Sequence, residues 1–358
     1  MSTTSASPRI WEGLLLGLVA TLAGLAVVEM GFRLATDRDM LTFKDWRTAR
    51  IEQRTLGARA IYDHVLGWKL RSGYRSDGYN TIAHGIRRND EEEEIRTGGI
   101  LAVGDSFTDG WDDVEDDGTW PAQLEGMLDI PVINGGVGGY ATDQIVMRAE
   151  QLLPIVKPKT LIVGFLDEDI LRSGHSSFGA SKPYFTLDNG TLRYHAPAPM
   201  GPPEQRKTTW GGKLRTVLGY LAGFDFVLGR LAPAYWYGSS GEEVFERVDN
   251  DPAGVTCALL KRLKAQAAAN NVRTLLFMQY GWQTVIENAA PNENAQRVSA
   301  CASEAGFELV DQFQSLRAMA VADRQEMTNL YAKEGDGYGH LNETGNWHAA
   351  DLVARALK

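Results

Sequence analysis

Short apolar runs alternate with helical segments over most of this chain, and this alternation most constrains its fold. The runs are short enough for strands that are buried on both faces. They cover residues 100–103, 132–133, 161–163, 272–278 and 307–310, and the helical segments cover 120–128, 144–153, 255–269, 294–305 and 344–357. Such alternation predicts a parallel sheet with right-handed crossovers and helices on both faces. We therefore expect a three-layer α/β/α domain over residues 99–358, with a doubly wound, flavodoxin-like sheet of five parallel strands.

Another apolar run, residues 13–28, has the composition of a membrane helix. A span needs roughly 20 apolar residues, so flanking residues must complete it. A signal peptide and a buried helix are the alternatives. However, Glu29 and Arg33 follow the run where a cleavage site of small residues would be expected. The sequence predicts that residues 1–35 form an uncleaved, single-pass anchor.

Basic residues are more frequent after this run than before it. Arg9 precedes it, whereas Arg33, Arg38, Lys44, Arg47 and Arg50 follow it. The positive-inside rule alone would therefore keep the domain in the cytoplasm, although long domains translocate largely regardless of charge.

Composition narrows the classes of partner. The formal net charge is -10 and no basic stretch is present, so nucleic acid is not an expected partner. Cys257 and Cys301 are too few for a disulfide framework and lack the clustered spacing of a zinc site. They form either one bridge or two buried thiols. No metal and no cofactor are expected.

Two stretches fall outside the regular alternation. Residues 36–98 are polar and Arg-rich, and we interpret them as a juxtamembrane stalk and entry segment. Residues 173–252 form a long irregular stretch, rich in aromatic residues, that interrupts the domain. Loops of this length are usually functional or disordered, and the aromatic content favours an ordered, cap-like insertion. Its rings fit a satellite core better than direct stacking on substrate.

Ser106 directly follows the first predicted strand, at the sheet edge where open α/β folds bind their ligands. A nucleophilic serine needs a neighbouring base, and the base needs an orienting acceptor. His340, just before the final helix, is the best candidate for the base. Asp336 precedes it by four residues, within reach across a turn-like loop, whereas Glu334 and Asp311 are weaker candidates. The predicted catalytic group is therefore Ser106, His340 and Asp336.

An acidic cluster at residues 112–117 superficially resembles a calcium loop. Twelve positions counted from Asp113 end on Leu124 rather than on a bidentate glutamate, and Pro121 falls inside the loop. We interpret the cluster as a solvated acidic rim beside the active-site mouth, which disfavours anionic substrates.

Several motifs occur in the order found in one superfamily. Residues 104–110 read GDSFTDG, residues 134–144 read NGGVGGYATDQ, and residues 66–70 and 84–87 read LGWKL and HGIR. Together with the apolar run, this arrangement resembles the SGNH/GDSL hydrolase superfamily, specifically its bacterial members with an N-terminal membrane helix. The resemblance implies that Ser106 is the nucleophile. It also implies that the backbone N–H groups of Ser106 and Gly139 form the oxyanion hole.

Two positions depart from the pattern of that superfamily. Residues 164–170 read GFLDEDI, which puts Glu168 where an oxyanion-hole asparagine normally lies. An ionised Glu168 would repel the oxyanion, so it is protonated, turns away, or leaves the donor to another group. The final motif normally reads Asp-x-x-His, but Gly337 occupies the position three before His340. Asp336 is taken as the substitute.

The sequence thus predicts a serine ester hydrolase that acts through an acyl-enzyme on Ser106. We expect short acyl esters, such as O-acetyl groups of envelope glycans, as substrates. The resemblance to anchored family members places the catalytic domain in the periplasm or outside the cell. The alternatives are an O-acyltransferase of the same fold, which delivers the acyl group to a glycan hydroxyl, and a catalytically weak envelope glycan-binding protein.

Overall fold

The computed structural model describes residues 8–35, 43–200, 210–237, 247–249 and 251–358. The chain forms two compact units. One, here called the helical unit, comprises Met1–Thr55 and Met200–Glu242. The other, here called the α/β unit, comprises Leu56–Pro199 and Glu243–Lys358.

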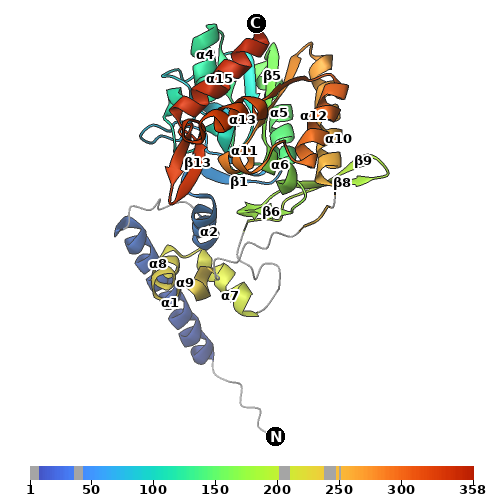
Figure 1. The fold of residues 1–358 in the computed structure, drawn as a ribbon. Coiled ribbons are helices and arrows are strands. Elements are labelled where there is room, and N and C mark those ends of the chain that lie inside the picture. Colours follow the sequence, from blue (N-terminus) through green and yellow to red (C-terminus); the bar gives the residue numbers. More distant parts are fainter. Residues whose placement is uncertain (1–7, 36–42, 201–209, 238–246, 250) are drawn as a thin grey trace. The chain divides into compact units, whose positions relative to one another are not determined.

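A five-stranded parallel sheet forms the centre of the α/β unit (Figure 1). Its strands are β3 (Ile100–Val103), β4 (Val132–Asn134), β5 (Thr160–Leu166), β10 (Arg273–Gln279) and β11 (Glu308–Asp311). They lie in the order β11-β10-β5-β3-β4, and every neighbouring pair is parallel. Numbered along the chain, this is the flavodoxin-like order 2-1-3-4-5. The predicted sheet is confirmed, and each strand lies within three residues of its predicted bounds.

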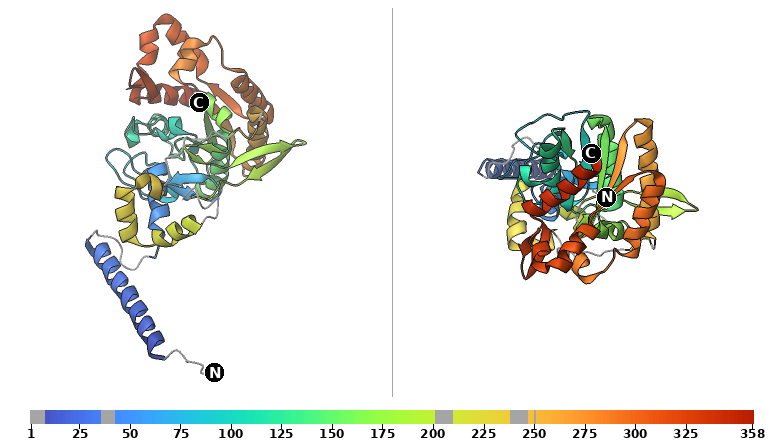
Figure 2. Two further views of the ribbon diagram at one scale, coloured as in Figure 1. Left: turned by 90° about the horizontal axis from the view of Figure 1, so that it is seen from below. Right: turned by 45° about the horizontal axis from the view of Figure 1, so that its top comes forward.

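Helices cover both faces of the sheet, as Figure 1 and the right-hand view of Figure 2 show. One face carries α4 (Trp120–Leu128) and α15 (Glu343–Leu357), and the other carries α5 (Thr142–Val156), α10 (Pro252–Ala269) and α12 (Glu293–Ala305). The largest difference from prediction is at α5, which begins at Thr142 rather than residue 144 and continues to Val156. The polar residues Thr142 and Asp143 of its first turn were not part of the apolar pattern that set the predicted bounds.

Shorter elements connect these layers. The remaining helices of the α/β unit are α3 (Ser106–Asp109), α6 (Asp167–Arg172), α11 (Trp282–Glu287), α13 (Phe313–Ala322) and α14 (Arg324–Thr328), with 3₁₀ turns η1 (Ala83–Gly85) and η2 (Asp116–Gly118). Antiparallel hairpins pair β1 (Ala60–Asp63) with β2 (Gly67–Leu70), β6 (Ser177–Phe178) with β7 (Ala180–Ser181), β8 (Tyr184–Asp188) with β9 (Thr191–His195), and β12 (Tyr331–Glu334) with β13 (Gly337–Leu341).

The two stretches outside the regular alternation divide differently from the prediction. Most of residues 36–98 belongs to the α/β unit rather than to a stalk, because β2 and the residues beside β2 and η1 supply buried side chains, among them Leu70, Leu66 and Ile86. The predicted insertion at 173–252 is split between the units. Its first part forms the β6–β9 hairpins, and residues 200–242 belong with the N-terminal helix.

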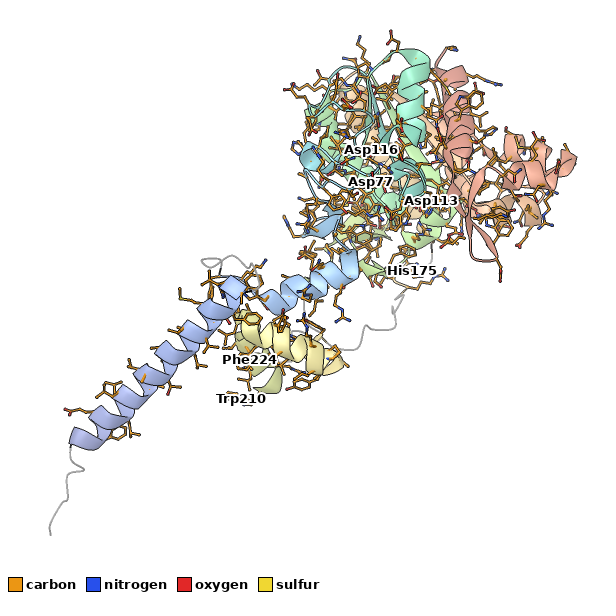
Figure 3. All side chains as sticks on the ribbon, turned by 90° about the vertical axis from the view of Figure 1, so that its left-hand side faces the viewer. Asp77, Asp113, Asp116, His175, Trp210 and Phe224 are labelled. Carbon is orange, nitrogen blue, oxygen red and sulfur yellow. A yellow bond between two sulfur atoms is a disulfide. The ribbon has the colours of Figure 1, made fainter. Side chains whose placement is uncertain are left out.

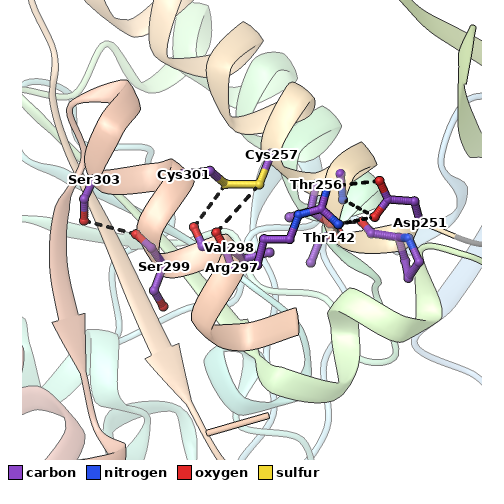
Figure 4. Close-up of a disulfide and its surroundings, with 11 residues drawn as sticks. Thr142, Asp251, Thr256, Cys257, Arg297, Val298, Ser299, Cys301 and Ser303 are labelled. Carbon is purple, nitrogen blue, oxygen red and sulfur yellow. Dashed lines mark hydrogen bonds and ion pairs between the residues drawn. A yellow bond between two sulfur atoms is a disulfide. The ribbon is translucent and has the colours of Figure 1, made fainter. Parts of the chain in front are cut away.

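A disulfide joins Cys257 to Cys301. Figure 4 shows that it connects α10 to α12, two helices on the same face of the sheet. Of the two alternatives for these cysteines, the structure therefore shows the single bridge. An ion pair between Arg297 and the N-cap residue Asp251 links the same two helices.

The helical unit contains α1 (Pro8–Ala35), α2 (Trp46–Leu56), α7 (Trp210–Gly219), α8 (Ala222–Leu231) and α9 (Pro233–Tyr237). The left-hand view of Figure 2 shows α1 as a single uninterrupted helix. Its 28 residues would extend about 42 Å, and the part from Trp11 to Ala35 is long and apolar enough to cross a membrane. The helix is longer than the predicted apolar run because it continues through Glu29 and Arg33, which form an ion pair one turn apart.

Candidate active site

Ser106 occupies the first position of α3, immediately beyond the carboxyl end of β3. The Asp105 side chain caps this short helix by accepting a hydrogen bond from Phe107 N–H at 2.9 Å. Gly104 permits the tight turn, because a Cβ atom there would lie 2.0 Å from Thr108 Oγ1. The sheet edge, the cap and the glycine together fix the direction of the serine side chain.

The glycine-rich loop after β4 packs directly against the segment that follows Ser106. A Cβ atom on Gly136 would lie 2.4 Å from Asp109 N, and one on Gly138 would lie 2.2 Å from the Trp111 ring. Asn134 at the end of β4 donates to Thr108 O and accepts from Gly136 N–H. The loop that carries the predicted second oxyanion donor, Gly139, is therefore held close to the serine loop.

His340 connects Ser106 to a carboxylate. Its Nε2 atom lies 2.9 Å from Ser106 Oγ, and its Nδ1 atom lies 2.9 Å from Asp113 Oδ2. The side chains of His340 and Asp113 are 25% and 26% exposed, so substrate and solvent can reach the site. A hydroxyl, an imidazole and a carboxylate in this order form the arrangement that activates a serine nucleophile.

The prediction that Asp336 orients His340 is wrong in this structure. Residues 337–341 form β13 rather than a turn-like loop, and Asp336 lies in the turn between β12 and β13. A strand rises about 3.3 Å per residue, so a separation of four residues carries Asp336 well away from the imidazole. The weaker candidates, Glu334 and Asp311, are also not the partner of His340 Nδ1.

Asp113 comes from the cluster that the sequence suggested was a solvated rim. It lies in the loop after α3 (Figure 3). Trp111 stacks on the His340 ring with a centroid distance of 5.8 Å, and the Arg59 guanidinium lies 4.3 Å from the centroid of Trp111. Arg59 also forms a bidentate pair with Asp112 at 2.6 and 2.8 Å. The neighbours of Asp113 thus fix the loop against the imidazole.

Arg87, in the HGIR segment, binds backbone carbonyl groups of the same loop. Its guanidinium is buried and donates to the carbonyl oxygens of Asp109, Trp111 and Val114 at 2.5 to 2.9 Å. It also pairs with Asp116. The carbonyls on both sides of Asp113 are therefore bound by one rigid side chain. Sequence reasoning singled out this segment only by resemblance and gave it no structural role.

A second ionisable group supports the loop at its beginning. Asp109 is buried and accepts a hydrogen bond of 2.6 Å from Tyr79 Oη. Burial raises the pKa of the Asp109 carboxyl, although the Arg87 charge, the Tyr79 hydrogen bond and the Arg59 charge oppose this. Burial and the Asp109 carboxylate raise the pKa of Tyr79 well above its ordinary value. Tyr79 therefore remains a hydrogen-bond donor at neutral pH.

Glu168, at the usual position of the oxyanion-hole asparagine, turns toward solvent. Its side chain is 62% exposed and pairs with Arg172 at 3.2 Å. Arg172 also contacts Asp169 at 2.6 Å and Asp105 at 3.5 Å, next to Ser106. Burial and then the Asp105 charge raise the pKa of Asp169 well above its ordinary value, against the effect of Arg172. Of the three possibilities for Glu168, its placement supports turning away.

Glu168→Gln is expected to leave kcat for an ester substrate within about fivefold of wild type, since exposed ion pairs contribute about 1 kcal/mol or less. The measurement is steady-state hydrolysis of a chromogenic acetyl ester. A loss of roughly 100-fold or more, the size expected for an oxyanion donor, would show instead that Glu168 acts on the developing negative charge.

Comparisons with known proteins found similar chains among the solved structures. No family model and no curated protein sequence matches the chain. Among solved structures, the chain is similar to a member of the lipolytic G-D-S-L family from Veillonella parvula, with 12% identity and a TM-score of 0.40 over 72% of this chain and 97% of that one. It is also similar to an acetyl xylan esterase, with 12% identity and a TM-score of 0.41 over 73% of this chain and 100% of that one.

A third similar structure is the lipase/acylhydrolase from Enterococcus faecalis, with 12% identity and a TM-score of 0.38 over 73% of this chain and 95% of that one. Because the identities and TM-scores are low, the chemistry assigned to the site depends on its own contacts.

Proposed function

We propose that this protein is a serine ester hydrolase with Ser106 as nucleophile, His340 as general base and Asp113 as the orienting carboxylate. The observation that carries the proposal is the continuous contact from Ser106 Oγ through both imidazole nitrogens to Asp113 Oδ2, with two distances of 2.9 Å.

The direction of proton transfer follows from these contacts. Asp113 accepts a hydrogen bond from His340 Nδ1–H, which leaves Nε2 as an acceptor for the Ser106 hydroxyl proton. Ser106 Oγ attacks the ester carbonyl while His340 takes up this proton and then delivers it to the leaving alcohol. Water attacks the acyl-enzyme in the second half-reaction, with His340 again acting as base.

The backbone N–H groups of Ser106 and Gly139 are the proposed oxyanion donors. The Ser106 N–H stands at the first position of α3, where a helix offers no intrahelical acceptor. Gly139 has a φ of 76°, a conformation that favours glycine, and its N–H donates to no residue that the structure describes. Both features leave these donors available to a tetrahedral intermediate.

Short acyl esters of neutral glycans are the proposed substrates. The loop that carries Asp113 is acidic, with Asp112, Glu115 and Asp117 near it, which disfavours anionic substrates. Trp111 is partly exposed beside His340 and offers a flat apolar face. The acidic loop and the exposed Trp111 face together favour a substrate with a small acyl group at Ser106 and a neutral, bulky alcohol beside Trp111.

We further propose that α1 anchors the protein in a membrane with the α/β unit outside the cytoplasm. The disulfide between Cys257 and Cys301 supports this orientation, because such bonds persist in oxidising compartments and are rare in the cytosol. The excess of arginine after the apolar run favours the opposite orientation, but long domains translocate largely regardless of charge.

Labelling with a fluorophosphonate probe tests the proposed nucleophile. We expect stoichiometric labelling of the wild-type protein, no labelling of Ser106→Ala, and labelling of His340→Ala that is slower by two orders of magnitude or more. Ser303→Ala, which removes an exposed hydroxyl on α12, is the matched control and should label like wild type. A correctly folded wild-type protein that does not react would refute the enzyme proposal and favour a glycan-binding protein.

The same acyl-enzyme would also serve an O-acyltransferase. Turnover of an acetyl donor should therefore be measured with and without an oligosaccharide acceptor, and both free acetate and acetylated sugar should be quantified. A hydrolase releases acetate at the same rate in both conditions. If acetylated sugar forms faster than free acetate is released, the reaction is acyl transfer rather than hydrolysis.

A further inference from the structure

The helical unit exposes large apolar side chains at regular spacing on two of its helices. Trp210, Leu214 and Val217 lie on α7, and Phe224, Val227 and Leu231 lie on α8. Their spacing of three, four or seven residues puts each set on one helix face. Trp210 is 87% exposed and Leu231 is 80% exposed. We call these six residues the apolar stripe. An exposed apolar helix face of this kind marks an interaction site.

Polar contacts attach α8 to the C-terminal end of α1. The Glu29 carboxylate accepts hydrogen bonds from the backbone N–H groups of Ala222 and Gly223 at 2.6 and 3.0 Å, and so caps α8. Phe32 contacts Phe226 edge-on, with a centroid distance of 4.9 Å. A carboxylate at a helix N-terminus is favourable because it compensates the unpaired N–H groups. These contacts explain why an acidic residue follows the apolar run.

The α8 part of the apolar stripe is continuous with the surface of α1. A groove of about 300 Å³ lies between the two helices, and Phe224 and Val227 line it together with Leu25, Val28 and Phe32 of α1. The side chains of α1 between residues 11 and 28 are exposed, as expected for a helix that contacts lipid. Apolar surface therefore passes from α1 onto α8, and Glu29 is the one charged residue among the described residues that line the groove.

Charge distinguishes the helical unit from the rest of the chain. The sequence of this unit contains twelve Lys and Arg residues and nine Asp and Glu residues, in a chain whose formal charge is -10. Lys213, Arg215 and Arg230 lie on α7 and α8, beside the apolar stripe. Basic residues next to Trp, Phe and Leu are typical of helices that lie at a membrane surface rich in anionic lipid.

We infer that the apolar stripe lies in the head-group region of the bilayer that α1 crosses, so that α7 and α8 form a second, interfacial contact with phospholipid. This inference rests on the proposed membrane anchor. Figure 3 labels Trp210 and Phe224, one on each helix of the stripe. The occupant is a phospholipid bilayer that contains anionic lipid, and the contact is made by the described residues of the helical unit alone.

Site-specific fluorescence in the full-length protein tests this inference. Both native cysteines are in the disulfide, so one introduced cysteine can be labelled with an environment-sensitive dye. Leu231→Cys and Leu214→Cys probe the stripe, and Leu22→Cys probes α1. Val321→Cys, an apolar residue of the α/β unit that is 72% exposed, is the matched control. The proteins are reconstituted into vesicles of phosphatidylethanolamine and phosphatidylglycerol that carry lipid-attached quenchers at two depths.

We expect blue-shifted emission for the two stripe labels, with stronger quenching by the shallow quencher than by the deep one. The Leu22→Cys label should show the reverse preference, and the Val321→Cys label should show neither effect. Stripe labels that are not quenched while the Leu22→Cys label is quenched would overturn the inference and leave the anchor intact. A blue shift without lipid quenching would overturn it in favour of a protein partner. An unquenched Leu22→Cys label would instead refute the anchor itself.

Discussion

Replacing Asp113 with asparagine is expected to lower kcat for ester hydrolysis by roughly 10³- to 10⁴-fold while KM changes little. In the proposed mechanism, the carboxylate fixes the tautomer of His340 that presents an acceptor to Ser106, and it stabilises the imidazolium that forms during attack. An asparagine amide has nearly the same shape but can donate to Nδ1 and favour the wrong tautomer. The measurement is steady-state hydrolysis of an acetyl ester by protein whose folding is checked by thermal melting.

Asp336→Asn is the matched control, because the sequence favoured Asp336 for the role that we propose for Asp113. We expect it to retain wild-type kcat, since Asp336 lies in the turn beyond β12. A large loss in Asp336→Asn together with a small loss in Asp113→Asn would restore the sequence prediction. It would also mean that the hairpin rearranges when substrate binds.

The fold was predictable because its signal is local. Each strand of the sheet is a short run of apolar residues, and the buried strands β3 and β5 require nothing from distant parts of the chain to be recognised. Ser106 was predictable for a related reason, since a residue directly after a buried parallel strand must lie at the carboxyl edge of the sheet. His340 also lies where the sequence placed it, before the final helix.

Asp113 was not predictable in this way because its position depends on contacts between distant segments. Arg87, which is 26 positions earlier in the sequence, binds the carbonyl oxygens of Trp111 and Val114, and Arg59 stacks on Trp111. Trp111 itself has a φ of 49°, which is unusual for a bulky residue. In the sequence, Asp113 is one of several acidic residues that a solvated surface would explain equally well. Only the folded loop distinguishes it from its neighbours.

The α/β unit contains a buried ion pair that connects the first turn of α5 to the residue after β7. Lys182 Nζ contacts Asp143 Oδ2 at 2.7 Å, and both side chains are fully buried. Lys182 also donates to the carbonyl oxygens of His175 and Pro183. Asp143 lies in the first turn of α5, four residues after Gly139. Burial raises the pKa of Asp143 and lowers that of Lys182, and their mutual attraction opposes both effects.

Lys182→Met is therefore expected to destabilise the protein by about 3 to 5 kcal/mol, because it leaves the Asp143 carboxylate buried without a counter-ion, although Gln144 N–H still donates to it. Thermal melting should show a decrease in Tm of roughly 10 °C. Lys261→Met, which removes an exposed lysine on α10, is the control and should change Tm by no more than about 2 °C. If Lys182→Met has the same Tm as wild type, water or backbone N–H groups are sufficient to stabilise the buried Asp143 carboxylate.

The loss of stability caused by Lys182→Met should also depend on pH. Without Lys182, the folded-state pKa of Asp143 lies further above its unfolded value, because the Lys182 charge and hydrogen bond no longer oppose burial, and only the backbone N–H groups of Gln144 and Asp143 still lower the pKa. The folded protein then binds the proton more tightly than the unfolded chain, so stability is greatest at low pH and is lost as pH rises through the folded-state pKa. The difference in Tm from wild type should shrink between pH 8 and pH 5. The double variant Lys182→Met/Asp143→Leu removes the buried charge, so it should recover much of the stability and lose this pH dependence.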